Sequence, residues 1–223
     1  MSWGAYLYGE KAEGNKTEGL LSQLSKRVGM IKLVSKYMDG RQLNSVIDGL
    51  FTSKLLYCLP LYSNVWSMRN MDDTERKFSA FTKEDIRRLQ VLQNRVLRIK
   101  CQNYNLNTPT ADLVKSCGDL SVHQLGVFHT LLQVFKIINS GQPVYLAEKL
   151  LLRRPNEDYV FPQRQANTLT VRGNLTLSRS GFLNRGARLW NLLPLEMRQQ
   201  SQLKLFRLEL RRWVTSNVPV KPQ

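Results

Sequence analysis

The sequence is poor in the residues that build disulfide frameworks and metal centres. It has three cysteines, Cys58, Cys101 and Cys117, and two histidines, His123 and His129. Three widely spaced cysteines with no Cys-x-x-Cys pair predict free thiols in an intracellular protein, and they do not separate nucleus from cytoplasm. Histidines six residues apart do not share one face of a helix, so neither a metal nor another cofactor is expected.

Long apolar runs are also missing. No uninterrupted apolar stretch of about 20 residues occurs, and the N-terminus has no basic region followed by an apolar one. We therefore expect neither secretion nor a membrane span. The hydrophobic fraction of 42% is nevertheless enough for a buried core in a chain of 223 residues, so the chain is expected to fold.

Acidic residues are scarce relative to basic ones. Asp and Glu total 17 against 33 Lys and Arg, which gives a net charge of +16, and the excess is spread along the whole chain. Such a surface is typical of proteins that contact phosphate groups. An acidic protein partner and an anionic membrane surface remain the alternatives.

Apolar side chains recur at three- and four-residue steps, which predicts a mainly α protein. The predicted helices span residues 17–40, 41–59, 83–100, 109–117 and 121–139, with one or two further turns within 145–152. The first two should pair antiparallel because they are joined by a short turn. Residues 153–174 lack a helical period and include extended pieces at 159–161 and 169–171.

Two further helices complete the chain. Ser178 or Ser180 can cap a helix whose apolar face includes Ala187 and Leu189, and the residue before a proline disfavours helical geometry, so this helix should stop before Pro194. A basic amphipathic helix follows within residues 203–214. Its predicted apolar stripe is Leu203, Phe206, Leu210 and Trp213.

The C-terminal third also contains a recognisable motif. Residues 182–194 match the pattern Phe-x-x-x-x-x-x-x-Trp-Asn-x-Leu-Pro, and the matching residues are Phe182, Trp190, Asn191, Leu193 and Pro194. This motif resembles the C-terminal region of reverse transcriptases from LINE-type (non-LTR) retrotransposons. Other short elements resemble that family in the same order: Tyr6-Leu7-Tyr8-Gly9, Leu56-Tyr57-Cys58-Leu59-Pro60 with Trp66, Leu89-Gln90-Leu92-Gln93-Arg95, and Leu120-Ser121-Val122-His123-Gln124.

The resemblance implies a helical, thumb-like bundle followed by a smaller helical C-terminal subdomain with minor extended segments. Residues 1–75 would hold a residual palm-edge strand and the antiparallel helix pair, and residues 76–152 a basic helical bundle. Residues 153–223 would hold the irregular segment and the basic C-terminal subdomain. In the intact family this region is expected to hold the template and primer duplex, and to help engage element RNA or target DNA.

Catalytic carboxylates of a polymerase palm are not recognisable. Asp72 and Asp73 are adjacent, but Asn70 replaces the aromatic residue of the family's Tyr-x-Asp-Asp box, and polar residues flank the pair. Cys117 and His123 are close in sequence but lie in no nucleophile motif. We therefore expect a fragment or degenerate copy of an RNA-directed DNA polymerase that is not an enzyme on its own.

Clusters of basic residues are the candidate functional surface, with RNA or DNA as the partner and no membrane. Lysine and arginine release counterions from phosphate when they bind a nucleic acid. The candidate residues are Arg87, Arg88, Arg95, Arg98, Arg153, Arg154, Arg179, Arg185, Arg188, Lys204, Arg207, Arg211 and Arg212. The alternative function is a helical scaffold or adaptor that binds acidic protein partners.

Overall fold

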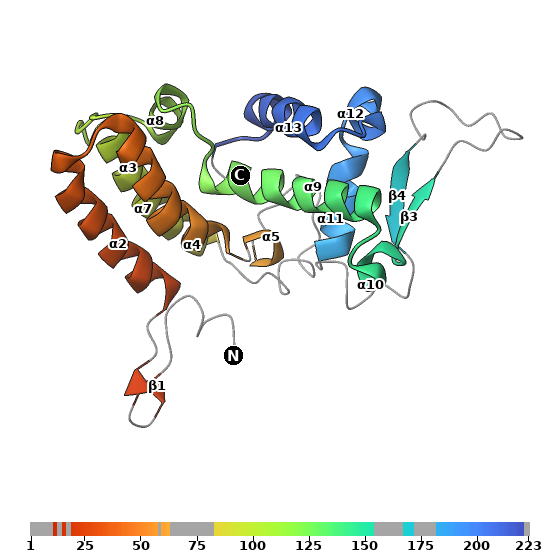
Figure 1. The fold of residues 1–223 in the computed structure, drawn as a ribbon, viewed down its shortest axis with the longest axis horizontal. Coiled ribbons are helices and arrows are strands. Elements are labelled where there is room, and N and C mark those ends of the chain that lie inside the picture. The colour runs from red at the N-terminus through yellow and green to blue at the C-terminus, as the bar shows by residue number, and fades with distance from the viewer. Residues whose placement is uncertain are drawn as a thin grey trace, which may run out of the picture. The chain divides into compact units, whose positions relative to one another are not determined.

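The computed structural model describes residues 11–12, 15–16, 19–57, 59–62, 83–153, 167–171 and 182–220. These residues are mostly helical (Figure 1), which confirms the prediction of a mainly α fold. The chain forms two compact units. Unit 1 comprises Met1–Ser67, Ala80–Leu125 and Val220–Gln223, and unit 2 comprises Met68–Ser79 and Gly126–Pro219.

The three predicted segments, 1–75, 76–152 and 153–223, do not coincide with these units. The expected division near residue 75 lies outside the described residues. In the described part, the chain passes from unit 1 to unit 2 between Leu125 and Gly126, inside helix α9 (Val122–Ser140).

Unit 1 contains a short hairpin and a group of helices. The hairpin pairs β1 (Lys11–Ala12) with β2 (Asn15–Lys16) antiparallel. The palm-edge strand that the resemblance implies, with its element Tyr6-Leu7-Tyr8-Gly9, lies outside the described residues. The helical elements are α2 (Leu20–Val34), the 3-10 turn η1 (Ser35–Tyr37), α3 (Gly40–Ile47), the π-helical turn η2 (Asp48–Thr52), α4 (Ser53–Leu56), α5 (Leu59–Tyr62), α7 (Lys83–Lys100) and α8 (Thr110–Ser116).

One apolar core joins α2, the α3–α4 region and α7. Among the described residues, Phe51 of η2 is the one aromatic side chain buried in this core. The buried residues that α7 contributes to it are Ile86, Leu89, Leu92, Val96 and Ile99. The guanidinium of Arg27 on α2 donates a hydrogen bond to the carbonyl of Leu50, 2.6 Å away. Arg27 and Leu50 lie about equally far before and after the turn near residue 39, and such residues meet when two helices run antiparallel. The hydrogen bond therefore confirms the predicted antiparallel pair.

The turn between α2 and α3 is set by a capping box at Asp39. Its Oδ1 accepts hydrogen bonds from the backbone N–H groups of Arg41 and Gln42, each at 2.8 Å, and Gln42 Oε1 accepts the Asp39 N–H. These bonds satisfy donors that the first helical turn leaves unpaired, so they fix where α3 begins.

The single helix predicted over residues 41–59 is interrupted. It widens into the π-helical turn η2, and the backbone leaves helical geometry at Tyr57, whose ψ is 114°. Pro60 has no N–H to donate to the fourth residue before it, and its ring crowds that residue's carbonyl, so a helix opens just ahead of a proline. A short helix, α5, resumes at Leu59 and includes Pro60.

Buried amides connect α7 to the start of α9. Gln90 Oε1 accepts the Val122 N–H at 2.9 Å, and Gln93 Nε2 donates to the Leu120 carbonyl at 2.8 Å. Gln90 Nε2 also donates to Gln93 Oε1 at 2.8 Å. Ser121 caps the start of α9, because Ser121 and Gln124 exchange side-chain and backbone hydrogen bonds.

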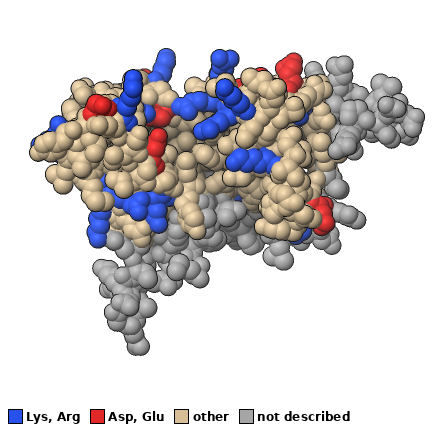
Figure 2. All heavy atoms as spheres, viewed as in Figure 1, with Lys and Arg blue, Asp and Glu red and all other residues tan. Residues whose placement is uncertain are grey.

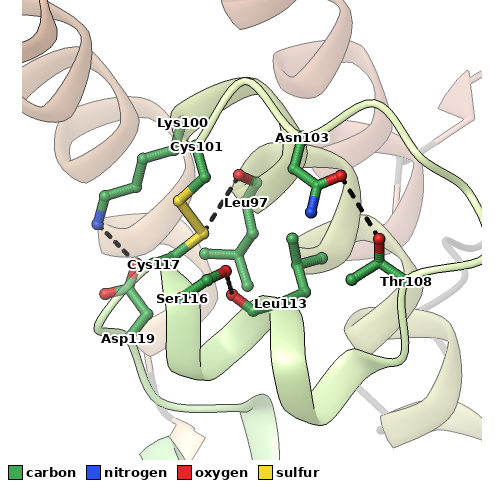
Figure 3. The surroundings of a disulfide bond; sticks show 9 residues. All are labelled: Leu97, Lys100, Cys101, Asn103, Thr108, Leu113, Ser116, Cys117 and Asp119. Carbon is green, nitrogen blue, oxygen red and sulfur yellow. Dashed lines mark hydrogen bonds and ion pairs between the residues drawn. A yellow bond between two sulfur atoms is a disulfide. The ribbon is translucent and has the colours of Figure 1, made fainter.

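The ends of α7 and α8 are linked by a disulfide between Cys101 and Cys117, with the two Cα atoms 5.9 Å apart (Figure 3). The prediction of free thiols was therefore wrong for these two cysteines, and Cys58 lies outside the described residues. An ion pair runs alongside the disulfide, with Lys100 Nζ 2.6 Å from Asp119 Oδ2. Two helix ends that lie side by side bring together cysteines 16 residues apart, which their sequence spacing does not reveal.

Unit 2 combines helices with one two-stranded sheet. Its elements after α9 are α10 (Val144–Ala147), β3 (Leu150–Arg153), β4 (Thr168–Val171), α11 (Phe182–Asn191), α12 (Leu195–Gln199) and α13 (Leu203–Asn217). β3 and β4 pair antiparallel, with Leu150 opposite Val171. The helical turns predicted over 145–152 were therefore half wrong: α10 forms, but the following leucines enter a strand because β4 supplies backbone partners. Of the predicted extended pieces, 169–171 is confirmed and 159–161 lies outside the described residues.

An aromatic cluster fills the core of unit 2. The rings of Phe135 on α9 and Phe206 on α13 stack with centroids 4.1 Å apart, and Trp190 on α11 lies 5.8 Å from Phe206. Helices α9 and α11 approach closely at Gly186, where a Cβ atom would come within 2.5 Å of Val134 Cγ2. A residue larger than glycine does not fit there without displacement of the buried Val134.

Candidate nucleic-acid interface

Helix α13 separates an apolar face from a basic one. Phe206, Leu210 and Val214 are buried at four-residue steps, and they hold the helix onto the aromatic core of unit 2. The predicted stripe was partly wrong, because Leu203 is exposed and Trp213 is only partly buried. Val214 takes the place that had been assigned to Trp213.

The opposite face carries the basic residues. Lys204, Arg207 and Arg211 recur at three- and four-residue steps, so they follow one line along the helix, and all three are exposed. Arg212 is also exposed and lies beside this line. In the space-filling view, Lys and Arg side chains gather over α13 (Figure 2).

Few acidic groups oppose this charge. Glu209 is the one acidic residue among the 15 residues of α13, against four basic ones. Within the described part of the chain, Lys204, Arg207 and Arg212 form no ion pair. Their charges therefore face solvent, where they can attract an anion.

The basic surface extends from α13 onto α9. Burial, together with the charges of Arg207 and Lys136, lowers the pKa of His129 to about 4. Lys136 is exposed, and its field reaches the same imidazole as that of Arg207. Sequence reasoning missed Lys136 because α9 was interpreted only as an apolar helix. Lys136 is the one lysine of α9, and a single lysine in an apolar helix is a weak indication of a basic surface.

The cluster on α7 is less free than the sequence suggested. Glu84 accepts hydrogen bonds from both Arg87, at 2.7 Å and 2.9 Å, and Arg88, at 3.1 Å. These hydrogen bonds lower the pKa of Glu84 to about 2, so the pairs persist at neutral pH. Two of the four candidate arginines of α7 are therefore paired with an acidic residue.

The other two arginines of α7 differ from each other. Arg98 turns back on its own chain, donating to the carbonyls of Asn105 at 3.4 Å and Leu106 at 3.3 Å. Arg95 is exposed and forms no ion pair in the described part of the chain. Within α7, Arg95 therefore resembles the arginines of α13 most closely.

The remaining candidates are not brought together. Arg185 is only 7% exposed, and burial lowers its pKa to about 10, which still leaves it charged at neutral pH. Its inclusion in an exposed basic surface was therefore wrong, because its position on α11 turns it inward. Arg188 is exposed on the same helix. Arg154 and Arg179 lie outside the described residues, and only the backbone of Arg153 is described.

The Trp-Asn-x-Leu-Pro motif is structural. Trp190 and Leu193 are buried, and the indole Nε1–H donates to the carbonyl of Asn167 at 3.0 Å. Asn191 ends α11, and Pro194 precedes α12, as the predicted proline stop requires. Phe182, the first residue of the motif, is partly buried at the start of α11.

His123 is buried and His129 is half-buried. Burial lowers the pKa of His123 to about 4, so it is neutral at physiological pH, as is His129. Among the described residues, no group of three or more His, Cys, Asp or Glu side chains could hold a metal ion. In the same part of the chain, no helix combines the length and the apolar character needed to cross a membrane.

No family model, curated protein or solved structure matches this chain.

Proposed function

We propose that the basic face of α13, extended by Lys136 of α9, binds the phosphate backbone of RNA or DNA. The observation that carries the proposal is the line of Lys204, Arg207 and Arg211 along one exposed helix face, with Arg212 beside it. Cations spaced along a helix can contact successive phosphates of a strand, and each contact releases counterions. Contacts of this kind position a nucleic acid without reading its sequence.

We also propose that the chain corresponds to the region C-terminal to the palm in LINE-type reverse transcriptases. Two sets of residues that resemble family elements support this. Gln90 and Gln93 of one element contact the backbone at Leu120 and Val122 of another, and Trp190 and Asn191 anchor the C-terminal subdomain. Residues that carry a family resemblance are expected to have such structural roles.

Salt-dependent binding tests the α13 surface. Affinity of the full chain for a fluorescent single strand of about 20 nucleotides should fall with log salt, at a slope near −0.7 for each phosphate contact. Replacing Arg207, Arg211 and Arg212 together by Gln should flatten that slope by up to about two units, and equally for strands of different sequence.

A control variant separates a local site from bulk charge. Changing Arg87, Arg88 and Arg95 together to Gln removes the same amount of charge from α7. Two of these arginines are already paired with Glu84. The control should change the slope much less than the α13 variant does. Equal slopes for both variants would mean that overall charge, rather than the face of α13, is responsible. No binding by the wild-type chain at low salt would reject the proposal.

The chain on its own should have no polymerase activity. Asp72 and Asp73, the one pair that superficially resembles the family's catalytic box, lie outside the described residues. We expect no extension of a primed RNA template above background with Mg²⁺ or Mn²⁺. Extension that is lost when both residues are changed to Asn would contradict this.

A further inference from the structure

Helix α2 carries a second apolar face that the core of unit 1 does not use. Its buried stripe is Leu20, Leu24, Val28 and Ile31. On the other side, Met30 is 46% exposed, Leu33 69%, and Tyr37, in the adjoining turn η1, 87%. Large apolar side chains that cluster on one exposed face mark an interaction surface more often than isolated ones do.

The spacing of these residues suits another helix. Met30, Leu33 and Tyr37 stand at positions i, i+3 and i+7, so they follow one line along the axis. Helix-on-helix recognition uses anchors at this spacing. Gly29 lies beside the line, and a Cβ atom there would meet nothing within 4 Å, so a partner backbone can approach the helix closely at this point.

The charge beside this face has one sign. Lys32 and Lys36 are exposed at four-residue spacing, adjacent to Leu33 and Tyr37. Neither lysine forms an ion pair within the described part of the chain. Residues 20–38 contain no Asp or Glu, and Asp39 is occupied by its capping bonds.

We propose that this face of α2 is a docking site for an acidic amphipathic helix of another protein. Apolar side chains of the partner would cover Met30, Leu33 and Tyr37, and its carboxylates would pair with Lys32 and Lys36. Complementary charge fixes the register of such a contact, and burial of the apolar line supplies most of the affinity.

Other occupants fit the same face less well. A second copy of the chain, related by a two-fold axis, would place lysines against lysines, which disfavours self-association. A nucleic-acid strand could use the lysines and stack on Tyr37, but it would leave Met30 and Leu33 uncovered. The proposal goes beyond nucleic-acid binding by α13 and does not depend on it.

Selection from a display library of acidic amphipathic peptides, with the full chain as bait, tests the proposal. Enriched peptides should carry apolar residues at i, i+3 and i+7 with flanking Asp or Glu. Leu33→Asp should weaken their binding by about tenfold or more, since a central apolar anchor is lost and a negative charge faces the acidic peptide. The double variant Lys32→Glu, Lys36→Glu should not bind the acidic peptides. A peptide whose acidic residues are changed to Lys should bind this double variant.

Two controls locate the binding site. Leu106→Asp on another exposed leucine, and the triple Gln variant of α13, should bind the selected peptides as the wild type does. Enrichment of no acidic peptide, or of peptides indifferent to Leu33→Asp, would overturn the proposal. It would equally be overturned if Leu33→Asp left peptide binding intact but removed binding to an oligonucleotide or to phosphatidylserine vesicles.

Discussion

The side-chain amide of Asn191 forms two hydrogen bonds with the backbone of Leu169, 22 residues earlier in the chain. Its Oδ1 accepts the Leu169 N–H at 2.7 Å, and its Nδ2 donates to the Leu169 carbonyl at 2.9 Å. An asparagine in this position acts as a short piece of strand, because it presents one donor and one acceptor to the edge of β4. It thereby ties the end of α11 to the two-stranded sheet of unit 2.

Changing Asn191 to Asp should destabilise the protein by about 1 to 3 kcal/mol. A carboxylate can still accept the Leu169 N–H, but its second oxygen would face the Leu169 carbonyl without a proton between them. Denaturant unfolding measures the loss, and Asn44→Asp on the exposed part of α3 should change stability by less than about 0.5 kcal/mol. Equal effects of the two substitutions would show that the pairing with Leu169 contributes little.

Two glycines should respond oppositely to alanine. Gly186→Ala places a methyl group 2.5 Å from Val134 Cγ2, in a buried contact of stiff side chains, and should cost about 1 to 3 kcal/mol. Gly29→Ala adds a methyl group in open space on an exposed helix position and should stabilise by about 0.5 to 1 kcal/mol. Thermal unfolding of both variants gives the signs. A stabilised Gly186→Ala would mean that α9 and α11 approach less closely than described.

Acid should destabilise the protein through His123. In the unfolded chain this histidine binds a proton near its ordinary pKa of 6.5, whereas in the folded protein burial lowers the pKa to about 4. The unfolded state therefore holds more protons between these values, so stability is complete above pH 6.5 and is lost as pH falls towards 4. The loss from this residue is on the order of 3 kcal/mol.

His123→Gln isolates that contribution, because glutamine does not titrate. The free energy of unfolding of the variant should vary less steeply between pH 6.5 and 4 than that of the wild type. His129→Gln should reduce the slope in the same direction, since burial and two nearby cations lower the pKa of His129 as well. An unchanged slope in His123→Gln would mean that His123 gains its proton equally in both states.

The link between Cys101 and Cys117 can be tested directly. Trypsin cuts after Lys100 and Lys115, so two peptides should remain joined in a digest made without reductant and separate after reduction. Cys117→Ser should lower stability by about 3 kcal/mol under oxidising conditions, since a closed loop of this length restricts the unfolded chain. Under reducing conditions the variant and the wild type should be alike. Three free thiols in native protein, or a linkage to Cys58, would contradict the assignment.

Local sequence patterns predicted the helices well, but they did not predict which residues far apart in the chain pair with each other. The inward residues of α7 and the cap at Ser121 follow from spacing within one or two turns, so the sequence contains them. The leucines of β3 could equally have continued a helix, and pairing with β4 decided the outcome. The buried position of Arg185 depends on what packs around α11, which no nearby residue indicates.

The candidate surface was predictable to a similar extent. Lys204, Arg207 and Arg211 could be placed on one face because the period of α13 is regular. The partners of Arg87 and Arg88 were overlooked although Glu84 stands three and four residues away, a spacing that the sequence does contain. The line of Met30, Leu33 and Tyr37 could also be recognised from its spacing in the sequence. The stripe that α2 buries was already enough to explain how this helix packs, so a second apolar face was not predicted.

The ring cluster of Phe135, Trp190 and Phe206 gives unit 2 an optical signature of its own. Aromatic side chains held in one asymmetric arrangement produce near-ultraviolet circular dichroism, which disappears when packing becomes fluid even if helices persist. Far-ultraviolet signal from the helices and near-ultraviolet signal from the cluster therefore report different levels of order. Spectra alone can separate a substitution that loosens this interior from one that changes only an exposed helix face.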